Sequence, residues 1–156
     1  ISRMGFDAGQ TADNLKNYQP SGMRQKPVEK DGILYIEDCY NASPDSMHAA
    51  VNVLSKVAKG RKIAVLGDML ELGEQSEKMH TEVGVYAKNM GVDLLLCTGE
   101  QAKFICDGFG ENALFFNSKS QVAQYIKDNA KKGDTIIFKA SNGMKFWEII
   151  QQVYEK

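Results

Sequence analysis

Short apolar runs without polar alternation recur along the chain, and a helical pattern follows each of them. Strands of this kind are buried on both faces, which is typical of parallel sheets joined by helical crossovers. The runs lie at 33–36, 62–66, 94–97, 114–116 and 135–138. The helical patterns follow at 44–59, 76–89, 101–107, 120–130 and 146–153. The sequence therefore predicts an α/β fold with an open, mostly parallel sheet and helices on both faces.

The turn between the first run and the first helix carries more polar groups than a connector needs. It reads Glu-Asp-Cys-Tyr-Asn-Ala-Ser-Pro-Asp-Ser from 37 to 46. Ser43 is expected as the helix N-cap and Pro44 as the first helical residue, which places unpaired N–H groups and the positive dipole end beside Asp38. Ligands of open α/β sheets bind at this carboxyl edge.

Asp38 has two interpretations. It is either a plain acid near the start of a helix, or its carboxylate oxygens hold a ribose or a cation. Tyr40 and Asn41 add a ring for stacking and an amide for hydrogen bonding in the same turn. This equipment favours a binding role.

A second polar segment follows the last apolar run, where Ala-Ser-Asn-Gly at 140–143 comes directly after Lys139. Lys139, Ser141 and Asn142 are expected at the same sheet edge, where an ammonium, a hydroxyl and an amide can hold a carboxylate or phosphate at a helix N-terminus. The alternative is an ordinary N-cap with a turn glycine. A lysine that ends an otherwise apolar strand favours the binding role.

Acidic residues also follow the second strand, at Asp68, Glu71 and Glu74. Paired carboxylates can bind magnesium or a substrate amine, but a solvated loop is the favoured interpretation. The two histidines, His48 and His80, fall on different helices and lack the spacing of metal ligands. No metal site is expected in this chain.

Composition argues against several classes of partner. Nineteen basic and twenty acidic residues leave a net charge of -1, so no uniform field favours nucleic acid or a membrane surface. The apolar runs are far shorter than a bilayer span, and no signal-peptide pattern is present. The three cysteines show no CxxC spacing and are expected as reduced thiols. We therefore expect a soluble, cytoplasmic protein.

Phosphate-binding motifs bear directly on function. The chain has no GxxxxGK(S/T) loop, so we do not expect it to cradle a nucleoside triphosphate by itself. Residues 108–113 match GxGxxA, but they follow a helix and precede a strand, which reverses the order of a dinucleotide site. We interpret this segment as a loop that ends a helix.

Residues 1–19 do not fit the cycle of strands and helices. Thr11 can cap a short helix through Leu15 and Tyr18, and Gln-Pro-Ser-Gly at 19–22 is typical of a linker. We expect residues 1–19 to be the end of a preceding domain and residues 20–156 to form the α/β domain. The chain would then be a fragment of a larger protein.

Three blocks of sequence resemble the C-terminal domain of the Mur ligase family. They are Asp-Cys-Tyr-Asn-Ala-Ser-Pro-Asp-Ser-Met at 38–47, Leu-Gly-Asp-Met-Leu-Glu-Leu-Gly at 66–73 and His-Thr-Glu-Val-Gly at 80–84. Within the family, the resemblance is to the branch that adds D-alanyl-D-alanine to a UDP-N-acetylmuramoyl-tripeptide in peptidoglycan precursor synthesis. It implies a monomeric enzyme with a Rossmann-like C-terminal domain that closes over ATP, and with the phosphate loop and the Mg²⁺ site elsewhere in the ligase.

The resemblance also implies a nucleotide site. Arg24, just after the linker, would reach the ATP phosphates, and Asp38 would hold the ribose. Asn41 would lie near the adenine or the ribose. Tyr40 and Pro44 of the same turn complete the expected nucleotide-binding residues.

For the dipeptide, the resemblance points to Ser141 and Asn142, and Lys139 is the third expected contact. The chain departs from the family pattern here, because Ala140 stands in place of a glycine and Asn142 in place of an arginine. Either Lys139 or Lys145 would then substitute for that arginine at the dipeptide carboxylate, or the acceptor would be placed differently.

The expected function is a share in an ATP-dependent, amide-forming ligation. Because such chemistry depends on positioning and charge stabilisation, no catalytic side chain is expected in this domain. The isolated chain should be inactive, because it has no phosphate loop. The alternative is a stand-alone Rossmann-like binding or interaction module without ligase activity. A sister Mur ligase or a folylpolyglutamate-type ligase is disfavoured, because these carry other residues at 40–42.

Overall fold

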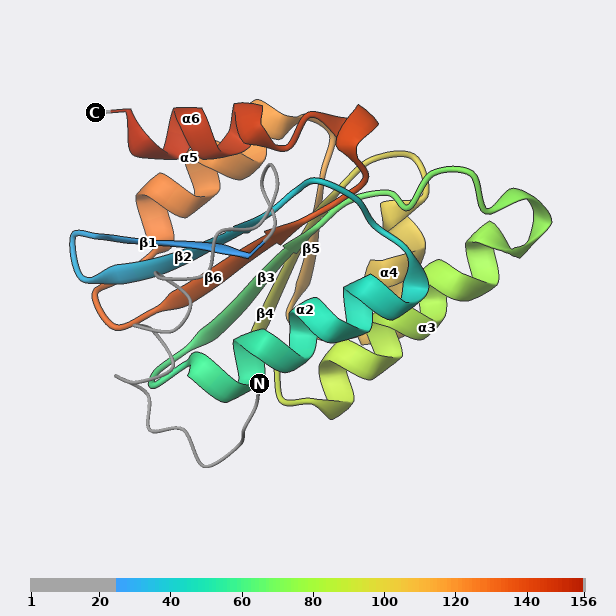
Figure 1. Cartoon of the computed structure of the whole chain (residues 1–156), viewed down its shortest axis with the longest axis horizontal. Coiled ribbons are helices and arrows are strands. Elements are labelled where there is room, and N and C mark those ends of the chain that lie inside the picture. Colours follow the sequence, from blue (N-terminus) through green and yellow to red (C-terminus); the bar gives the residue numbers. More distant parts are fainter. Residues whose placement is uncertain (1–24, 156) are drawn as a thin grey trace.

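The computed structural model describes residues 25–155, which form a six-stranded sheet with helices on both faces (Figure 1). The sheet order is β1-β2-β6-β3-β4-β5. The strands are β1 (Lys26–Lys30), β2 (Ile33–Asp38), β3 (Lys62–Leu66), β4 (Leu94–Thr98), β5 (Ala113–Phe116) and β6 (Thr135–Lys139). The helices are α2 (Pro44–Val57), α3 (Ser76–Asn89), α4 (Ala102–Phe109), α5 (Lys119–Asn129) and α6 (Trp147–Tyr154), and single 3₁₀ turns lie at η1 (Gly73–Gln75) and η2 (Asn142–Met144).

The sheet is parallel from β2 to β5, which confirms the predicted fold class. Alternate residues of each inner strand enter different cores. In β3, Ala64 and Leu66 join a core with α2, α3 and α4, whereas Ile63 and Val65 join one with α5 and α6. This explains why the inner strands show no polar alternation.

The antiparallel edge strand β1 is absent from the sequence prediction. It reads Lys-Pro-Val-Glu-Lys and is half exposed, so it has no apolar run to reveal it. Its register with β2 places Lys30 opposite Ile33, across a turn in which Asp31 and Gly32 both have positive φ angles. Proline and charged residues are typical of edge strands, where they discourage pairing with other chains.

The start of α2 matches the prediction. The Ser43 hydroxyl accepts a hydrogen bond from the Ser46 N–H, the Ser46 hydroxyl accepts one from the Ser43 N–H, and Pro44 is the first helical residue. These paired bonds satisfy amides that the first helical turn would otherwise leave unpaired.

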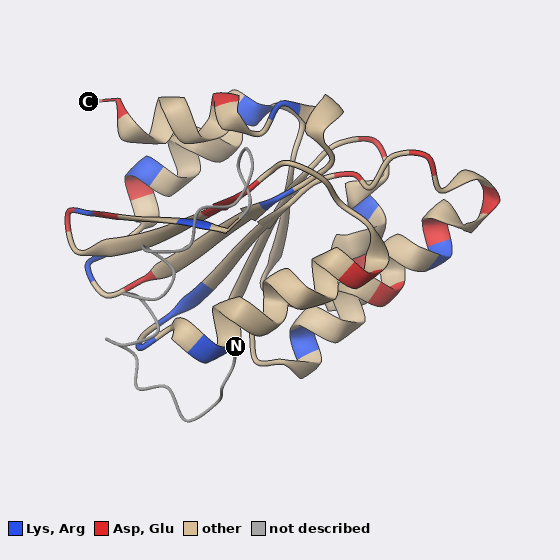
Figure 2. Cartoon of the chain, viewed as in Figure 1, with Lys and Arg blue, Asp and Glu red and all other residues tan. Residues whose placement is uncertain are grey.

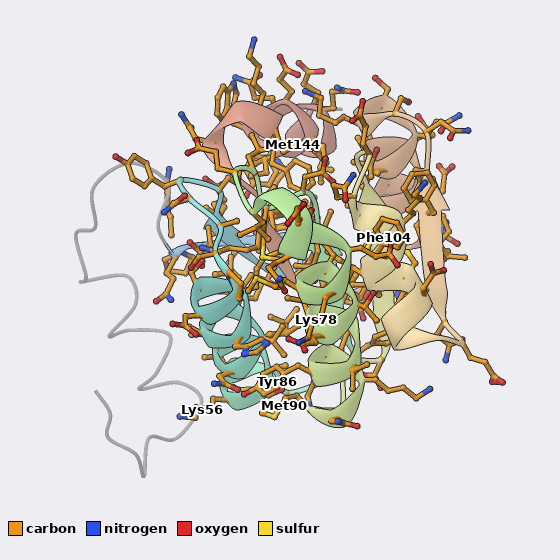
Figure 3. The ribbon with its side chains drawn as sticks, turned by 90° about the vertical axis from the view of Figure 1, so that its right-hand side faces the viewer. Lys56, Lys78, Tyr86, Met90, Phe104 and Met144 are labelled. Carbon is orange, nitrogen blue, oxygen red and sulfur yellow. The ribbon has the colours of Figure 1, made fainter. Side chains whose placement is uncertain are left out.

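Small residues allow α3 and α4 to cross closely. A Cβ atom at Gly84 would lie 2.0 Å from the carbonyl oxygen of Ile105, and one at Gly108 would lie 2.1 Å from that of Thr81. On the other side of α3, the Tyr86 hydroxyl donates to Asn52 of α2 at 2.6 Å. Figure 3 looks onto this side of the molecule, with Tyr86 labelled on α3 and Phe104 on α4.

Charged residues of both signs are distributed over the elements, in keeping with the low net charge (Figure 2). Acidic residues recur in the segment between β3 and α3. Among the described residues, no helix is both long and apolar enough to cross a membrane.

All three cysteines are free thiols, in agreement with the expectation. Cys39 and Cys97 are buried, and burial raises the pKa of the Cys39 thiol to about 12. Cys106 lies partly exposed on α4, and a hydrogen bond from Cys97 lowers the pKa of its thiol.

We therefore expect Cys106 to react first with an aromatic disulfide reagent at about pH 8, because the thiolate is the nucleophile and Cys39 stays protonated there. A Cys106→Ser variant should lose the fast phase of colour release. A fast phase that persists in this variant would contradict the assignment.

Candidate functional site

The carboxyl ends of β2, β6 and β3 lie level with one another at one edge of the sheet. Lys139 of β6 pairs with Asp38 of β2 on one side and with Leu66 of β3 on the other. The segments that follow these strands therefore leave the sheet together (Figure 1). The geometry brings together the turn at 38–44, the loop at 67–73 and the segment at 140–145. The sequence predicts that the first and the last of these meet, but it does not place the loop with them.

Asp38 and Lys139 form a buried ion pair at this edge. The Lys139 Nζ donates to Asp38 Oδ1 at 3.0 Å, and both side chains are about 95% buried. The sequence interpretation placed Lys139 against a substrate anion, but the structure gives its ammonium to the neighbouring strand. The pair locks β2 to β6 directly beneath the following turns.

The turn after β2 exposes two of the residues that were expected to meet a nucleotide. Tyr40 is 42% exposed and Asn41 is also exposed, while Pro44 begins α2 beside them. Arg24, and the predicted helix and linker of residues 1–22, lie outside the described residues. Their roles stay predictions, as does the division of the chain at residues 19 and 20.

The loop at 67–73 is not the solvated loop that the sequence favoured. Asp68 is buried, and its carboxylate accepts hydrogen bonds from the N–H groups of Glu100, Gln101 and Ala102 at 2.8 to 3.1 Å. It thereby caps the start of α4. Only the distal acids of the group, Glu71 and Glu74, are exposed.

Gly99, directly before the capped amides, is a sequence signal that could have revealed this cap. A Cβ atom at Gly99 would lie 2.4 Å from Asp68 Oδ1, and Gly99 has a φ angle of 130°. The carboxylate therefore needs a glycine at this position.

His80 is a second residue whose role the sequence did not reveal. It is fully buried on α3, and its Nε2 accepts a hydrogen bond from the Met69 N–H at 2.9 Å. Its other polar neighbours are the carbonyl oxygen of Ser76, 2.7 Å from Nδ1, and the hydroxyl of the same residue at 3.3 Å. Among residues 25–155, no group of three or more His, Cys, Asp or Glu side chains is placed to hold a metal ion.

The segment after β6 differs from its prediction as well. The last helix does not begin at 141–143; η2 comes first, and Lys145 adopts a left-handed conformation with a φ angle of 54° before α6 starts at Trp147. The Ser141 hydroxyl does not cap η2 but accepts the Leu70 N–H at 2.9 Å. Asn142 and Lys145 remain exposed.

Comparison with known proteins decides the family. The family model described as "Mur ligase, glutamate ligase domain" matches residues 23–142 of this chain. The chain belongs to the Mur ligase family. This confirms the resemblance drawn from the three sequence blocks, all of which fall inside the matched range.

Two similar proteins have the same name. The UDP-N-acetylmuramoyl-tripeptide–D-alanyl-D-alanine ligase of Bacillus subtilis is 37% identical over 97% of this chain, and that of Escherichia coli is 32% identical over 97%. These matches cover only 35% of each relative, so the chain spans about a third of their length.

Solved structures agree with these matches. A crystal structure of the MurF ligase of Thermotoga maritima in complex with ADP has a TM-score of 0.78 and is 28% identical, over 88% of this chain and 31% of that one. A MurF structure from Acinetobacter baumannii has a TM-score of 0.82 at 25% identity, over 92% of this chain and 33% of that one.

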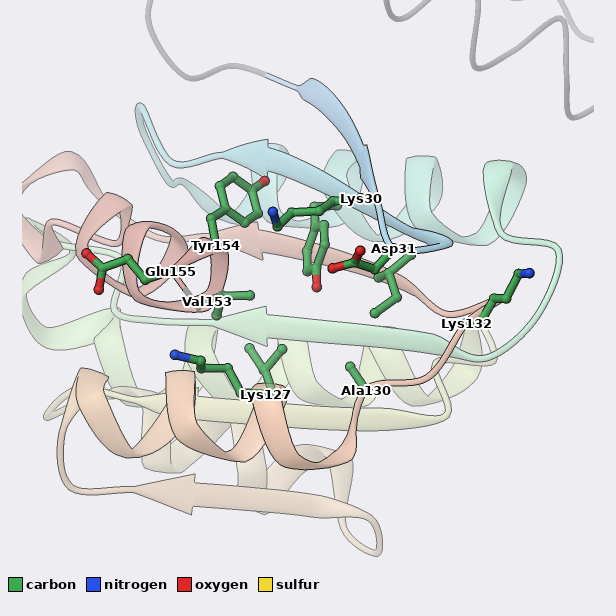
Figure 4. Close-up of a pocket in the computed structure, with 11 residues that line it drawn as sticks. Lys30, Asp31, Lys127, Ala130, Lys132, Val153, Tyr154 and Glu155 are labelled. Atoms are coloured by element: carbon green, nitrogen blue, oxygen red, sulfur yellow. The ribbon is translucent and has the colours of Figure 1, made fainter.

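A hollow of about 420 Å³ lies away from the carboxyl edge in this Mur ligase domain. The turn between β1 and β2, the end of α5 and the end of α6 line it, with Tyr154 on one wall (Figure 4). The side chains of Lys127 and Lys132 point in different directions, so their charges do not converge on one point. Ligand sites depend on convergent polar groups, which favours the carboxyl edge as the site.

Proposed function

We propose that the chain is the C-terminal domain of an ATP-dependent ligase that joins D-alanyl-D-alanine to a UDP-N-acetylmuramoyl-tripeptide. The observation that carries the proposal is the match of almost the whole chain to about a third of ligases with that name. The ADP in the Thermotoga maritima relative supports a nucleotide substrate. The meeting of three polar segments at the carboxyl edge supports a role in binding.

In the proposed reaction, the terminal carboxylate of the tripeptide takes the γ-phosphoryl group of ATP, which gives an acyl phosphate and releases ADP. The amine of the dipeptide then attacks the acyl phosphate, so that an amide forms and phosphate leaves. The domain supplies no nucleophile. Its residues hold the substrates in place, which is the main source of rate enhancement in phosphoryl-transfer chemistry.

The nucleotide is proposed to lie over the turn at 38–44. The exposed Tyr40 ring offers a surface for the base, and the Asn41 amide offers a donor and an acceptor beside it. The Asp38–Lys139 pair fixes the strand ends below, with Asp38 as the proposed ribose contact. The phosphate loop and the Mg²⁺ site are proposed to lie in another part of the ligase, as the family resemblance implies.

The dipeptide is proposed to lie on the other side of Lys139, between the 67–73 loop and η2. Asn142 and Lys145 are both exposed there and offer an amide and an ammonium to a carboxylate. Lys145 is the better replacement for the arginine of the family, because the Lys139 ammonium is already paired with Asp38.

We expect the purified chain alone neither to hydrolyse ATP nor to form an amide, because it has no phosphate loop. The intact ligase should convert the UDP-linked tripeptide to the pentapeptide only when ATP and D-alanyl-D-alanine are both present, as measured by mass spectrometry. L-alanyl-L-alanine serves as the control dipeptide.

Two outcomes would contradict the proposal. Amide formation by the chain alone would show that it is not a dependent domain. An intact protein that makes no pentapeptide would favour the alternative of a binding module without ligase activity.

A further inference from the structure

The first half of the 67–73 loop is fixed residue by residue. The Gly67 N–H donates to the Lys139 carbonyl at 2.9 Å, and the Asp68 carbonyl accepts from the Ser141 N–H at 3.0 Å. The next two amides, of Met69 and Leu70, donate to side chains from other elements. A surface loop rarely has this many fixed points, since loops are ordinarily the mobile part of a domain.

His80 supplies the first of these side-chain acceptors, and its tautomer follows from its partners. Nδ1 lies 2.7 Å from the carbonyl oxygen of Ser76, which can only accept, so Nδ1 carries the proton. Nε2 is then an unprotonated acceptor for the Met69 N–H at 2.9 Å. The imidazole thus acts as a neutral bridge from α3 to the loop.

Ser141 supplies the second acceptor, from the far side of the loop. Its hydroxyl oxygen lies 2.9 Å from the Leu70 nitrogen, and the residue is 94% buried, with a relative exposure of 6%. His80 and Ser141 therefore hold successive amides from α3 and from the segment after β6. No single movement of either element frees both amides.

The fixed loop presents two exposed side chains next to η2. Leu70 is 43% exposed and approaches Gly143, where an added Cβ atom would lie 3.0 Å from Leu70 Cδ1. Glu71 follows with a φ angle of 67°, an uncommon conformation for a residue with a side chain. The loop tip and η2 thus form one continuous surface at the carboxyl edge.

We propose that His80 and Ser141 are positioning residues for the amino donor. Through the amides of Met69 and Leu70 they hold the loop tip against η2, so that the surface that receives the dipeptide is already formed before binding. The inference rests on the proposed function for the identity of the donor. It predicts an effect on the dipeptide and not on ATP, because the nucleotide turn follows β2, on the other side of Lys139.

Amide hydrogen exchange in the chain tests the anchoring without any assay of ligation. The Met69 and Leu70 amides should exchange slowly although they lie in a loop. His80→Leu should speed exchange at Met69 by about tenfold or more, and Ser141→Ala should do so at Leu70. Rapid exchange of both amides in the unmodified chain would overturn the anchoring.

Kinetics of the intact ligase test the positioning role. His80→Leu and Ser141→Ala should each raise KM for D-alanyl-D-alanine by about three- to tenfold, with KM for ATP changed by less than about twofold. His80→Gln should recover much of the loss, because its side-chain carbonyl can accept in place of Nε2. Thr81→Ala, which removes a local hydrogen bond on the same helix, is the matched control.

Equal rises in both KM values, or none, would overturn the inference, since a general loosening of the domain affects both substrates. An unmodified ligase that is inactive with the dipeptide would instead overturn the proposed function. The exchange experiment decides the anchoring in either case.

Discussion

Asp68→Ala is expected to lower the melting temperature of the domain by roughly 10 °C, through a loss of about 3 to 5 kcal/mol in the free energy of unfolding. The buried carboxylate accepts three backbone N–H groups at the start of α4. Hydrogen bonds to a charged acceptor are among the stronger ones, and removal of the acceptor leaves the buried Ala102 N–H without a partner, together with two partly buried N–H groups. Thermal unfolding followed by circular dichroism measures the change.

Asp93→Ala is the matched control for this change. Asp93 also accepts a backbone N–H, from Lys62 at 2.9 Å, but it is exposed, so water replaces the lost partner. We expect a loss of about 1 kcal/mol or less for this variant. Equal losses for the two variants would mean that Asp68 does not act as a buried cap.

Asp38→Ala is expected to have a similarly large effect on stability, of about 3 to 5 kcal/mol, because it leaves the buried Lys139 ammonium without its carboxylate. Chemical denaturation in urea measures it. The residue types alone favoured a ligand contact whose loss would leave folding unchanged. Because the ion pair is buried, we expect a loss of stability instead of unchanged folding.

A double-mutant cycle separates the pair from the rest of the site. Lys139→Met alone should also destabilise, but the combination with Asp38→Leu should recover part of the loss, because no charge is then buried without a partner. Asp45→Ala, an exposed acid in the first turn of α2, is the surface control. Strictly additive losses in the cycle would contradict the assignment of the ion pair.

The parts of the fold that the sequence predicted are those with a local signal. Buried parallel strands such as β3 and β4 are short apolar runs, and α2 begins with a serine cap and a proline. The edge strand β1 lacks that signal, because a strand with one open edge and charged side chains has the composition of a loop.

The meeting of Asp38 and Lys139 at one sheet edge was predicted, but their contact with each other was not. Topology alone places Asp38 and Lys139 at one sheet edge, because carboxyl ends of parallel strands meet there. Their mutual ion pair depends on β6 lying beside β2, which chain order does not reveal. The hydroxyl of Ser141 likewise accepts from a backbone amide 71 residues earlier in the chain. His80 accepts from an amide only 11 residues earlier, but no residue type predicts that contact.

The break before α6 had a weaker signal. Gly143 was interpreted as part of a helix start, whereas η2 and the left-handed Lys145 come first. A lysine has no preference for the left-handed conformation, so no residue type in this segment predicts the interruption before α6. Phe146, the next residue after Lys145, packs into the core that α5 and α6 form with the sheet.

Hydrogen–deuterium exchange of the intact ligase tests most directly the claim that the carboxyl edge is the substrate-binding edge. Exchange is measured with and without a non-hydrolysable ATP analogue together with D-alanyl-D-alanine. We expect added protection in peptides that cover 38–44, 67–73 and 140–145, and no change at the opposite edge, in the turns at 58–61 and 130–134. Protection confined to that opposite edge, or unchanged exchange at all three carboxyl-edge segments, would contradict the account.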